Sequence, residues 1–444
     1  MTKILHITQY CHLGSTGGTE RYVLDLVKGL ESHGISNAIV WLQGDKGIEE
    51  QNCEGIRILP LPAPPMRVDT PVLGLEALVN DLLDNERPDW VHFHTFSLSE
   101  AVIGRLARER GISCAFTYHS PGWTCRRETL LKFGQEPCDG KVSAWRCSAC
   151  QSQERLNSSK MAGYFAAATS CAVGWLGLAD GTTSFRRRTA FFHDTRRFGA
   201  TLRDFLFSCS VVVACADWSI PLLQLNGARK DSIVHCPQGV SESFLQLLAS
   251  AKPDIKDDEI FTVGYVGRMT PVKGIHILME GFIQTNYSHA QLRIVGWEPD
   301  NATTPYARRI RELAERDSRI VLVPKKNQLG TIEEYQRFDL LAIPSVWLET
   351  GPLTLMEAAA SGVRVYGSNR IGQLGLLRRH GHVVESNSAT GWSEALTSAF
   401  DDHTRGSKVD QLPWLGAIRN MSHVSIEHLA FYMAGEGVIM TLRT

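Results

Sequence analysis

The sequence Val346-Trp347-Leu348-Glu349-Thr350-Gly351-Pro352-Leu353-Thr354-Leu355-Met356-Glu357-Ala358 joins two segments of different character. The preceding apolar run, Phe338 to Pro344, predicts a buried strand, and Leu353 to Gly362 predicts a helix. Pro352 suits the first helical position, where a missing N–H costs nothing, and Gly362 suits the C-terminal end. The stretch is therefore expected to lead from a strand through a loop into a helix.

The start of this expected helix has the chemistry of a binding site. Unpaired backbone N–H groups and the positive end of the helix dipole meet there, which favours an anion. Glu349 in the loop and Glu357 early in the helix add carboxylates that accept hydrogen bonds from hydroxyls. Phosphate and sugar hydroxyls together suggest a nucleotide-sugar as the ligand.

Length, charge and cysteine content limit the classes of protein to consider. A chain of 444 residues is too long for one typical core, so we expect two domains. Its 46 lysines and arginines nearly balance 47 aspartates and glutamates, which gives no indication of a nucleic-acid partner. Met1 to Thr8 lacks the basic and long apolar regions of a signal peptide, so we expect a cytoplasmic protein. Eleven cysteines in such a chain indicate reduced thiols or a metal site rather than a disulfide framework.

The first half begins with a glycine-rich loop between an expected strand, Lys3 to Thr8, and an expected helix, Thr19 to Ser32. The loop contains Gly17 and Gly18. Glycines at such a place bring a phosphate or sugar close to the backbone, although a flexible turn has the same composition. Both interpretations stay open from these residues alone.

Further strand-like and helix-like segments alternate, which predicts a parallel sheet covered by helices. They are Ala38–Leu42, Ile56–Leu61, Leu73–Leu83, Trp90–His94, Leu98–Arg110, Cys114–His119, Val211–Ala214 and Ser232–Cys236. His119 ends one of these strands, where open α/β sheets place ligands. It is a candidate for contact with substrate, against the alternative of a structural histidine.

Four cysteines follow: Cys125, Cys138, Cys147 and Cys150. Cys147 and Cys150 form a knuckle with two intervening residues, and four thiolates could enclose a tetrahedral zinc. The first two cysteines do not form a matching knuckle. The sequence therefore leaves a structural zinc site and four unligated thiols as alternatives.

The segment Met161 to Ala179 is apolar and rich in alanine and glycine, and it is followed by the basic residues Arg186, Arg187, Arg188, Arg196, Arg197 and Arg203. Its low leucine and isoleucine content argues against a membrane span. We expect a helical insertion that packs on the domain, with peripheral attachment to an anionic membrane surface as the alternative.

The second half predicts another doubly wound domain after a polar linker, Pro253 to Glu259. Its first strand, Thr262 to Val266, ends at a loop that carries Arg268 and Lys273, both placed to reach one diphosphate. A helix, Ile275 to Ile283, follows. The remaining segments are expected as the strands Gln291–Val295, Ile320–Val323, Leu340–Ile343 and Val363–Tyr366 and the helices Tyr306–Arg316, Thr331–Arg337 and Leu353–Ser361.

These patterns predict three parts of the chain. Residues 1–240 form an acceptor-side Rossmann-like domain with a cysteine-rich insert at about 122–205. Residues 241–424 form a Rossmann-like domain for the donor, and residues 425–444 contain a helix, Ser425 to Met433, that crosses back to the first domain. The predicted fold class is α/β, with two Rossmann-like domains facing across a cleft.

The sequence resembles the retaining glycosyltransferases of family 4, which have this GT-B architecture. The resemblance covers nearly the whole chain: Gly17 to Glu20 is similar to the early glycine loop, Gly267 to Gly274 to the diphosphate site, and Glu349 to Glu357 to the paired-glutamate signature. The last motif is the most specific of the three.

The resemblance implies a role for each candidate residue. Arg268 and Lys273 hold the donor diphosphate, with the N–H groups of Leu353 and Thr354. Glu357 binds the ribose hydroxyls, and Glu349 binds the transferred sugar. His119 matches the histidine that lies beside the sugar in the family. No catalytic metal is expected, because side chains and a helix dipole supply the positive charge.

The chain departs from the family after its expected last strand. The family usually has two adjacent glycines and a glutamate there, whereas this chain has Ile371, Gly372 and, in place of the glutamate, Gly375. An isoleucine avoids positive φ and is expected to fill space near the nucleotide.

The expected activity is sugar transfer from a nucleoside diphosphate sugar to an acceptor hydroxyl with retention, in polysaccharide or glycoconjugate synthesis. The acceptor is a soluble saccharide or a lipid-linked one at the inner face of a membrane. The alternatives are a non-catalytic binding scaffold of the same fold and a phosphorylase-like or sucrose-forming relative.

Overall fold

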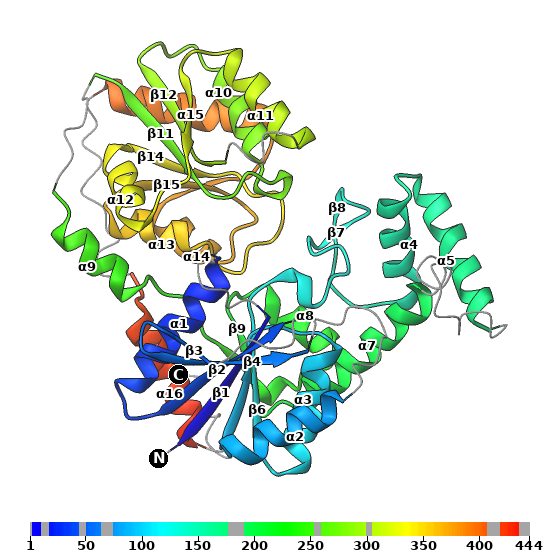
Figure 1. Ribbon diagram of the computed structural model, residues 1–444. Helices are drawn as coiled ribbons and strands as arrows, with labels where there is room; N and C mark the ends of the chain where they lie inside the picture. Colours follow the sequence, from blue (N-terminus) through cyan, green and yellow to red (C-terminus); the bar gives the residue numbers. More distant parts are fainter. Residues whose placement is uncertain are drawn as a thin grey trace. The chain divides into compact units, whose positions relative to one another are not determined.

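The computed structural model describes residues 2–9, 17–43, 50–63, 74–175, 191–252, 259–298, 304–405 and 418–434. Two compact units make up the chain (Figure 1). Unit 1 comprises Met1–Pro237 together with Val424–Thr444, and unit 2 comprises Gln238–His423. The first boundary lies three residues before the one expected at 240/241.

Unit 1 is built on a sheet with the strand order β10-β9-β6-β5-β1-β2-β4-β3. The strands are β1 (Lys3–Thr8), β2 (Ser36–Gln43), β3 (Gln51–Cys53), β4 (Ile56–Pro62), β5 (Trp90–Phe93), β6 (Ser113–Tyr118), β9 (Val211–Ala214) and β10 (Ile233–His235). All neighbouring strands pair in parallel except β3 and β4. The parallel sheet that the alternating sequence predicted is confirmed.

Helices cover both faces of this sheet (Figure 1). The helices are α1 (Gly18–Glu31), α2 (Leu75–Glu86), α3 (Leu98–Glu109), α7 (Phe191–Ser208), α8 (Ser219–Leu225) and α16 (Met421–Ala434). Side chains at odd spacing along a strand point to opposite faces. On β5, Phe93 contacts Phe205 of α7 at 5.1 Å between ring centroids, whereas Trp90 contacts Tyr432 of α16 at 5.3 Å. The two helices therefore lie on opposite faces of the sheet.

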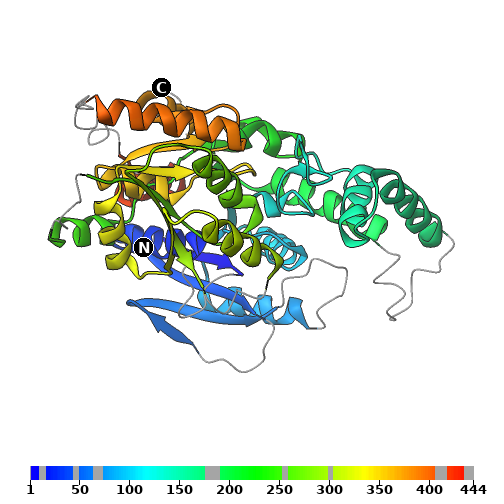
Figure 2. The ribbon, with the colours of Figure 1, turned by 90° about the horizontal axis from the view of Figure 1, so that it is seen from above.

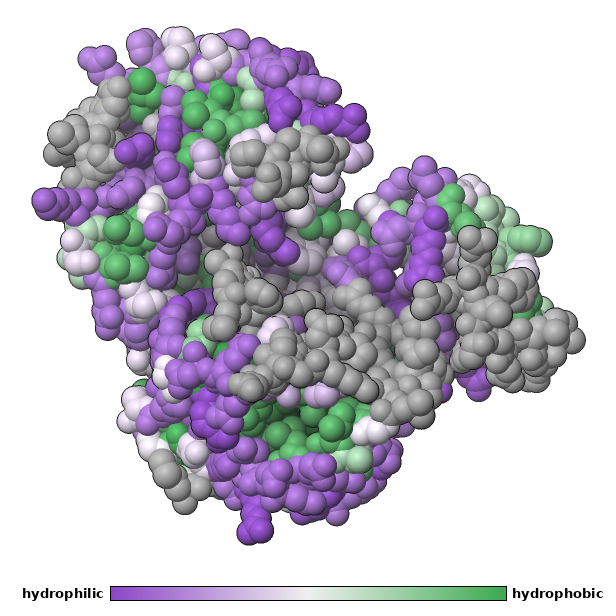
Figure 3. All heavy atoms as spheres, in the orientation of Figure 1, coloured by the Kyte–Doolittle hydropathy of each residue, from purple (hydrophilic) through white to green (hydrophobic). Residues whose placement is uncertain are grey.

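The insert after β6 contains a 3₁₀ turn, η1 (Pro121–Trp123), a short hairpin of β7 (Leu131–Lys132) and β8 (Glu136–Pro137), and the helices α4 (Ala144–Arg155) and α5 (Lys160–Trp175). The two helices pack side by side before α7 (Figures 1 and 2). Met161 and Phe165 on α5 are 78% and 77% exposed, and apolar surface is visible over this part of the chain in Figure 3. The predicted helical insertion is thus present, whereas Arg186, Arg187 and Arg188 lie outside the described residues.

A search of the described helices found none that combines the length and apolar character needed to cross a membrane.

Unit 2 contains a fully parallel sheet with the order β13-β12-β11-β14-β15-β16. Its strands are β11 (Phe261–Val266), β12 (Ala290–Trp297), β13 (Ile320–Pro324), β14 (Leu340–Ile343), β15 (Arg364–Ser368) and β16 (His382–Val384). Numbered within the unit, this is the order 3-2-1-4-5-6 of the doubly wound nucleotide-binding fold. The fold class predicted for this half is confirmed.

Two hydrophobic cores hold the helices of unit 2 on its sheet. The helices are α9 (Glu242–Ser250), α10 (Ile275–Ile283), α11 (Pro305–Glu315), α12 (Gln328–Arg337), α13 (Leu353–Ala360), α14 (Leu374–His380) and α15 (Ala389–Thr404). On β14, Leu340 and Ala342 join the core under α10, α11 and α15, and Leu341 and Ile343 join the core under α9, α12, α13 and α14. Alternation along one buried strand therefore supplies both faces.

The helix α16 belongs to both units. Its first residues, Met421 to His423, lie in unit 2, where the Met421 N–H donates to the Val240 carbonyl at 3.0 Å. The rest of the helix lies in unit 1. The predicted last helix, Ser425 to Met433, is present within it, and the expected linker residues 253–258 lie outside the described residues.

Candidate functional site

The candidate residues of unit 2 gather where the strand order reverses, between β11 and β14. Loops that leave the carboxyl ends of these two strands diverge there, and open α/β sheets bind ligands in the crevice that results. The loop after β11 contains Lys273, and the loop after β14 contains Glu349. A backbone bond from Val346 N–H to the Val272 carbonyl, 2.9 Å long, ties the two loops together.

Lys273 and Glu349 form an ion pair, with 2.6 Å between Nζ and Oε1. The glutamate side chain is 7% exposed and the lysine side chain 20% exposed. The Lys273 ammonium also lies 5.5 Å from the centroid of the Trp347 ring, at cation–π range. A cation is therefore held at the switch point with part of its surface open to a ligand.

Glu349 is fixed by three loops. The Ser345 hydroxyl donates to its Oε1, and its backbone N–H donates to the Arg370 carbonyl at 2.8 Å. Burial alone would raise the pKa of Glu349, but the charge of Lys273 and the hydrogen bonds that Lys273 and Ser345 donate to the carboxylate outweigh burial and hold the pKa below its usual value. The carboxylate therefore stays ionised at neutral pH.

Gly274 allows the loop after β11 to approach the end of β14. Its φ is +71°, and a Cβ at this position would lie 1.9 Å from the Pro344 carbonyl oxygen. Only glycine satisfies both conditions at low cost, since a side chain would strain the left-handed backbone and collide with the backbone of the neighbouring loop.

We predict that Gly274→Ala lowers the free energy of unfolding by roughly 2–5 kcal/mol, from left-handed strain together with overpacking. Gly362→Ala is the matched control, because Gly362 has φ +77° and an added Cβ would meet nothing within 4 Å. The free energy of unfolding of Gly362→Ala should fall only by the cost of the left-handed backbone, about 1–2 kcal/mol. Urea unfolding of both variants measures the difference, and equal losses would contradict the proposed contact.

The start of α13 is the second feature of this site. The helix begins at Leu353, with Pro352 as its N-cap residue rather than its first helical residue, and no acidic side chain lies in its first turn. Leu353 and Thr354 are partly exposed. Their backbone N–H groups are among those that a helix start leaves without intrahelical partners, so this end can accept an anion.

Glu357 lies one turn further along α13. Burial raises the pKa of its carboxyl group above the usual value, although the Tyr335 hydroxyl donates to Oε2 at 3.0 Å and acts in the opposite direction. The side chain is thus oriented by a buried phenol, and a carboxylate can accept further hydrogen bonds from hydroxyls.

Arg268 follows β11 and is exposed, and its backbone carbonyl accepts a hydrogen bond of 3.0 Å from the Tyr265 hydroxyl. Arg268 thus lies on the same loop as Lys273, and its side chain extends from an anchored backbone.

The expectation for Ile371 was wrong. Ile371 is 2% exposed, lies in the core under α13 and α14, and has no positive φ. Its side chain packs against Gly367 and Leu377, so it fills interior volume rather than space near a nucleotide. The close approach in this loop is made by Gly372, where a Cβ would lie 2.3 Å from the Glu349 carbonyl oxygen. Gly375 is exposed in the first turn of α14.

The candidate residues of unit 1 lie at the start of α1 and at the end of β6. Gly17 is the N-cap residue of α1 and Gly18 its first residue. His119 directly follows β6 and is 6% exposed. Its ring meets that of Tyr22 from α1 edge-on, with 4.6 Å between the centroids, and burial lowers the pKa of His119 to about 3.

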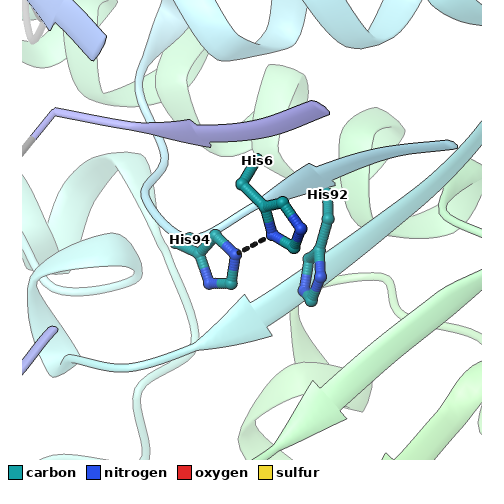
Figure 4. A group of neighbouring side chains, drawn as sticks. All are labelled: His6, His92 and His94. Carbon is teal, nitrogen blue, oxygen red and sulfur yellow. Dashed lines mark hydrogen bonds between the residues drawn. The ribbon is translucent and has the colours of Figure 1, made fainter. Parts of the chain in front are cut away.

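A cluster of buried histidines surrounds His119, and it was not predicted from the sequence. His6 of β1 pairs with His92 of β5 across the sheet, and His94 follows two residues later on the same face. Figure 4 shows the three side chains together, with the bond between His6 and His94. The pairing of a histidine in the first strand with the His-Phe-His sequence of 92–94 was the signal available.

The three histidines offer nitrogen atoms within 4.8 Å of one another, a spacing that a metal ion could bridge. Hydrogen bonds already use these nitrogens, however. His92 bonds to the hydroxyls of Thr117, at 2.7 Å, and Tyr432. The cluster is therefore a hydrogen-bonded network in the described structure.

The four cysteines of the insert lie in one region without reaching ligand spacing. The Phe133 N–H donates to the Cys150 sulfur at 3.0 Å, and the Ser143 N–H donates to the Cys147 sulfur at 3.4 Å. Zinc with Zn–S bonds of about 2.3 Å needs sulfur atoms roughly 3.8 Å apart. Among the described residues, no three of Cys125, Cys138, Cys147 and Cys150 have sulfurs within 4.8 Å of one another.

Two sequence profiles of known families match this chain. The profile described as Glycosyltransferase Family 4 matches residues 16–150, and that described as Glycosyl transferases group 1 matches residues 249–411. Together they cover more than half of the chain. No curated protein sequence gives a significant match.

Solved structures with the same fold cover nearly the whole chain. A glycosyltransferase from Rickettsia africae has a TM-score of 0.66 at 16% identity and covers 99% of both chains. Sucrose-phosphate synthase from Thermosynechococcus elongatus has a TM-score of 0.63 at 15% identity, and the match covers 98% of this chain and 99% of the synthase chain. The HepE protein of Anabaena, in complex with UDP and glucose, has a TM-score of 0.63 at 14% identity. The match covers 98% of this chain and 100% of HepE. At these identities the likeness shows the fold alone.

Proposed function

The chain belongs to the family 4 glycosyltransferases with the GT-B architecture, and we propose that it transfers a sugar from a nucleoside diphosphate sugar to an acceptor hydroxyl with retention of anomeric configuration. One observation carries this proposal: at the switch point of unit 2, Lys273 of the loop after β11 pairs with Glu349 of the loop that leads into α13. A cation, a carboxylate and a helix start there match the parts of a nucleotide-sugar.

The proposed roles of the cationic groups follow from the charge that develops during transfer. As the bond from sugar to phosphate breaks, negative charge grows on the departing diphosphate. Lys273, Arg268 and the N–H groups of Leu353 and Thr354 stabilise that charge, and such preorganised groups usually make the largest contribution to catalysis. No divalent cation is needed at the diphosphate in this scheme, so adding magnesium or manganese should leave turnover unchanged.

The carboxylates and the histidine are proposed to bind hydroxyls. Glu357 accepts hydrogen bonds from the ribose, and Glu349 and His119 contact the transferred sugar, with Gly17 and Gly18 at the acceptor side. Glu349 is already engaged by Lys273 and Ser345, which suits a positioning role better than that of a nucleophile. We therefore favour retention without a covalent double displacement.

A thermal-shift screen with UDP, GDP, ADP and their sugar derivatives tests donor binding. A ligand at 100 times its Kd stabilises the folded state by about 2.7 kcal/mol, which corresponds to a rise in Tm of roughly 5–10 °C for a domain of this size. Glu357→Gln should reduce the shift produced by the preferred nucleotide, because the amide replaces one acceptor oxygen by a donor. Glu333→Gln, at an exposed position of α12, is the control and should leave the thermal shift unchanged.

Activity assays with the nucleotide found in this screen distinguish enzyme from scaffold. Transfer or donor hydrolysis, with a product of the same anomeric configuration as the donor by NMR, is the expected result. A donor that binds without being consumed, with every acceptor tried, would instead indicate the non-catalytic scaffold, for which the exposed Gly375 in place of the family's glutamate is the motivating observation.

The acceptor is proposed to be a saccharide, either soluble or carried by a lipid. The exposed Met161 and Phe165 on α5 favour attachment of the insert to a membrane surface. Liposome flotation with anionic lipid, compared between the wild type and a Met161→Ser/Phe165→Ser variant, tests this. Equal flotation of the two proteins would remove α5 from the proposal.

We also propose a structural zinc at Cys125, Cys138, Cys147 and Cys150. It is supported by the four-thiol donor set and by backbone N–H groups that point at two of the sulfurs, as thiolate ligands require. Binding must draw the sulfurs together from their described spacing. Elemental analysis should find about one zinc per chain, and a Cys147→Ser/Cys150→Ser variant should lose it. Metal-free protein with four titratable thiols would end this proposal.

A further inference from the structure

A continuous row of hydrogen bonds joins Asn37 to His119 through two buried histidines of unit 1. Asn37 Oδ1 lies 3.1 Å from His6 Nε2, and His6 Nδ1 lies 3.0 Å from His94 Nε2. His94 Nδ1 in turn lies 3.1 Å from His119 Nε2. A neutral imidazole has one donor nitrogen and one acceptor nitrogen, so each ring in such a row determines the proton position of the next.

The direction of the row is set at Asn37. The Asn37 Nδ2 group donates to the Ile35 carbonyl at 3.1 Å. Turning the amide over would place Oδ1 against that carbonyl oxygen, and two acceptors cannot bond to each other. Asn37 therefore presents its oxygen to His6, and His6 Nε2 must carry the proton.

The remaining protons follow from this first one. With its proton on Nε2, His6 presents the lone pair of Nδ1 to His94, so His94 must donate from Nε2. His94 then presents Nδ1 to His119, which donates from Nε2 in the same way. All three histidines thus have the same tautomer.

The rings are neutral at physiological pH, as this scheme requires. Burial lowers the pKa of His6 to about 4 and that of His119 to about 3, and it holds the pKa of His94 well below the usual value. An imidazolium, which would donate from both nitrogens and break the row, forms only in acid.

We propose that Asn37, His6 and His94 are positioning residues that hold His119 with its proton on Nε2 and its lone pair on Nδ1. The group that binds at Nδ1 of His119 must then be a hydrogen-bond donor. A sugar hydroxyl meets this condition, whereas an ionised phosphate oxygen, which only accepts, is rejected. The assignment of that donor to the transferred sugar rests on the proposed function; the tautomer is a property of the chain without ligand.

The direct test is the ¹⁵N NMR spectrum of the full-length protein labelled at its histidines, recorded at pH 7.5 in EDTA without substrate. Long-range proton–nitrogen correlations identify which ring nitrogen is protonated. We expect His6, His94 and His119 each to show a protonated Nε2 and an unprotonated Nδ1. Signals are assigned by His6→Gln, His94→Gln and His119→Gln. Protonation of His119 at Nδ1, or at both nitrogens, would overturn the proposal.

A variant of Asn37 tests the placement of the proton. Asn37→Leu removes the acceptor that sets the direction of the hydrogen bonds, so His119 should show a mixture of tautomers. The value of kcat/KM should fall about three- to tenfold, as the loss of one neutral hydrogen bond predicts. His33→Gln, at an exposed position, is the control for both readouts.

The same spectra test the metal alternative. Zinc chloride added to protein freed of EDTA should leave the signals of His6 and His94 unchanged, whereas a stoichiometric shift at these residues and at His92 would show a metal site and overturn the proposal. If the Asn37→Leu protein does not fold, the wild-type spectrum decides alone. If the tautomers are as expected but no sugar is transferred, the proposed function fails and the inference about the chain stands.

Discussion

Replacing Lys273 by alanine is expected to lower kcat/KM by roughly 10²–10³-fold, the cost of removing one preorganised electrostatic contact to a developing charge. It should also lower the free energy of unfolding by about 2–4 kcal/mol, because Glu349 is almost fully buried and its charge would lose the partner that offsets burial. The pKa of the carboxyl group should then rise, because burial is the largest influence on it.

A double variant separates the two losses. In Lys273→Met/Glu349→Gln no charge is left buried, so most of the stability should return while activity stays low. Lys325→Met, which removes an exposed lysine paired with Glu298, is the matched control and should change neither quantity much. Urea unfolding and steady-state kinetics measure both. An unchanged kcat/KM in Lys273→Ala, with an identified donor, would contradict the role assigned to the lysine.

Acidification from pH 7.5 to 5.5 is expected to remove several kcal/mol of stability from unit 1. His6, His92, His94 and His119 are buried as neutral rings, and burial lowers their pKa values, to about 4 for His6 and about 3 for His119. Below pH 6.5 the unfolded chain therefore binds protons that the folded chain does not, and stability falls with pH down to the folded-state values. At pH 5.5 a ring with a folded-state pKa of about 4 or lower contributes about 1.4 kcal/mol.

This loss is comparable with the whole stability of a typical domain, so unit 1 should unfold in mild acid. Urea unfolding at the two pH values, with EDTA present, measures it. His6→Gln should reduce the pH-dependent part by about 1.4 kcal/mol, whereas the exposed His33→Gln should not. A midpoint independent of pH between 7.5 and 5.5 would show that the rings are not buried in the neutral form.

The loop and helix at 346–358 could be predicted because each cue is local. An apolar strand, a proline, a glycine and two glutamates determine a strand, a turn and a helix start within a short stretch, and the loop at Lys273 follows the same pattern. The sequence did not show that Lys273 reaches Glu349, or that Ser345 orients the Glu349 carboxylate. That contact depends on strand order, which places β11 beside β14.

Ile371 illustrates the opposite case. A departure from a family motif was interpreted as an obstruction, because the motif gives the position along the chain and not the direction of the side chain. In the structure the side chain lies in the core, and Gly372 makes the close approach. The histidine network was missed for a related reason: its members come from β1, β5 and the end of β6, far apart in sequence, and each one alone resembles an ordinary buried histidine.

The helix α16 has a consequence for synthesis of the chain on the ribosome. Unit 1 occupies the first 237 residues, but His428 and Tyr432, which pack against Tyr22, Trp90 and His92, are made only after all of unit 2. At 5–20 residues per second the intervening segment takes roughly 10–40 s to translate. During that interval the first sheet lacks α16 over Trp90 and His92, so unit 1, although most of it is made first, can pack fully only once α16 has been made.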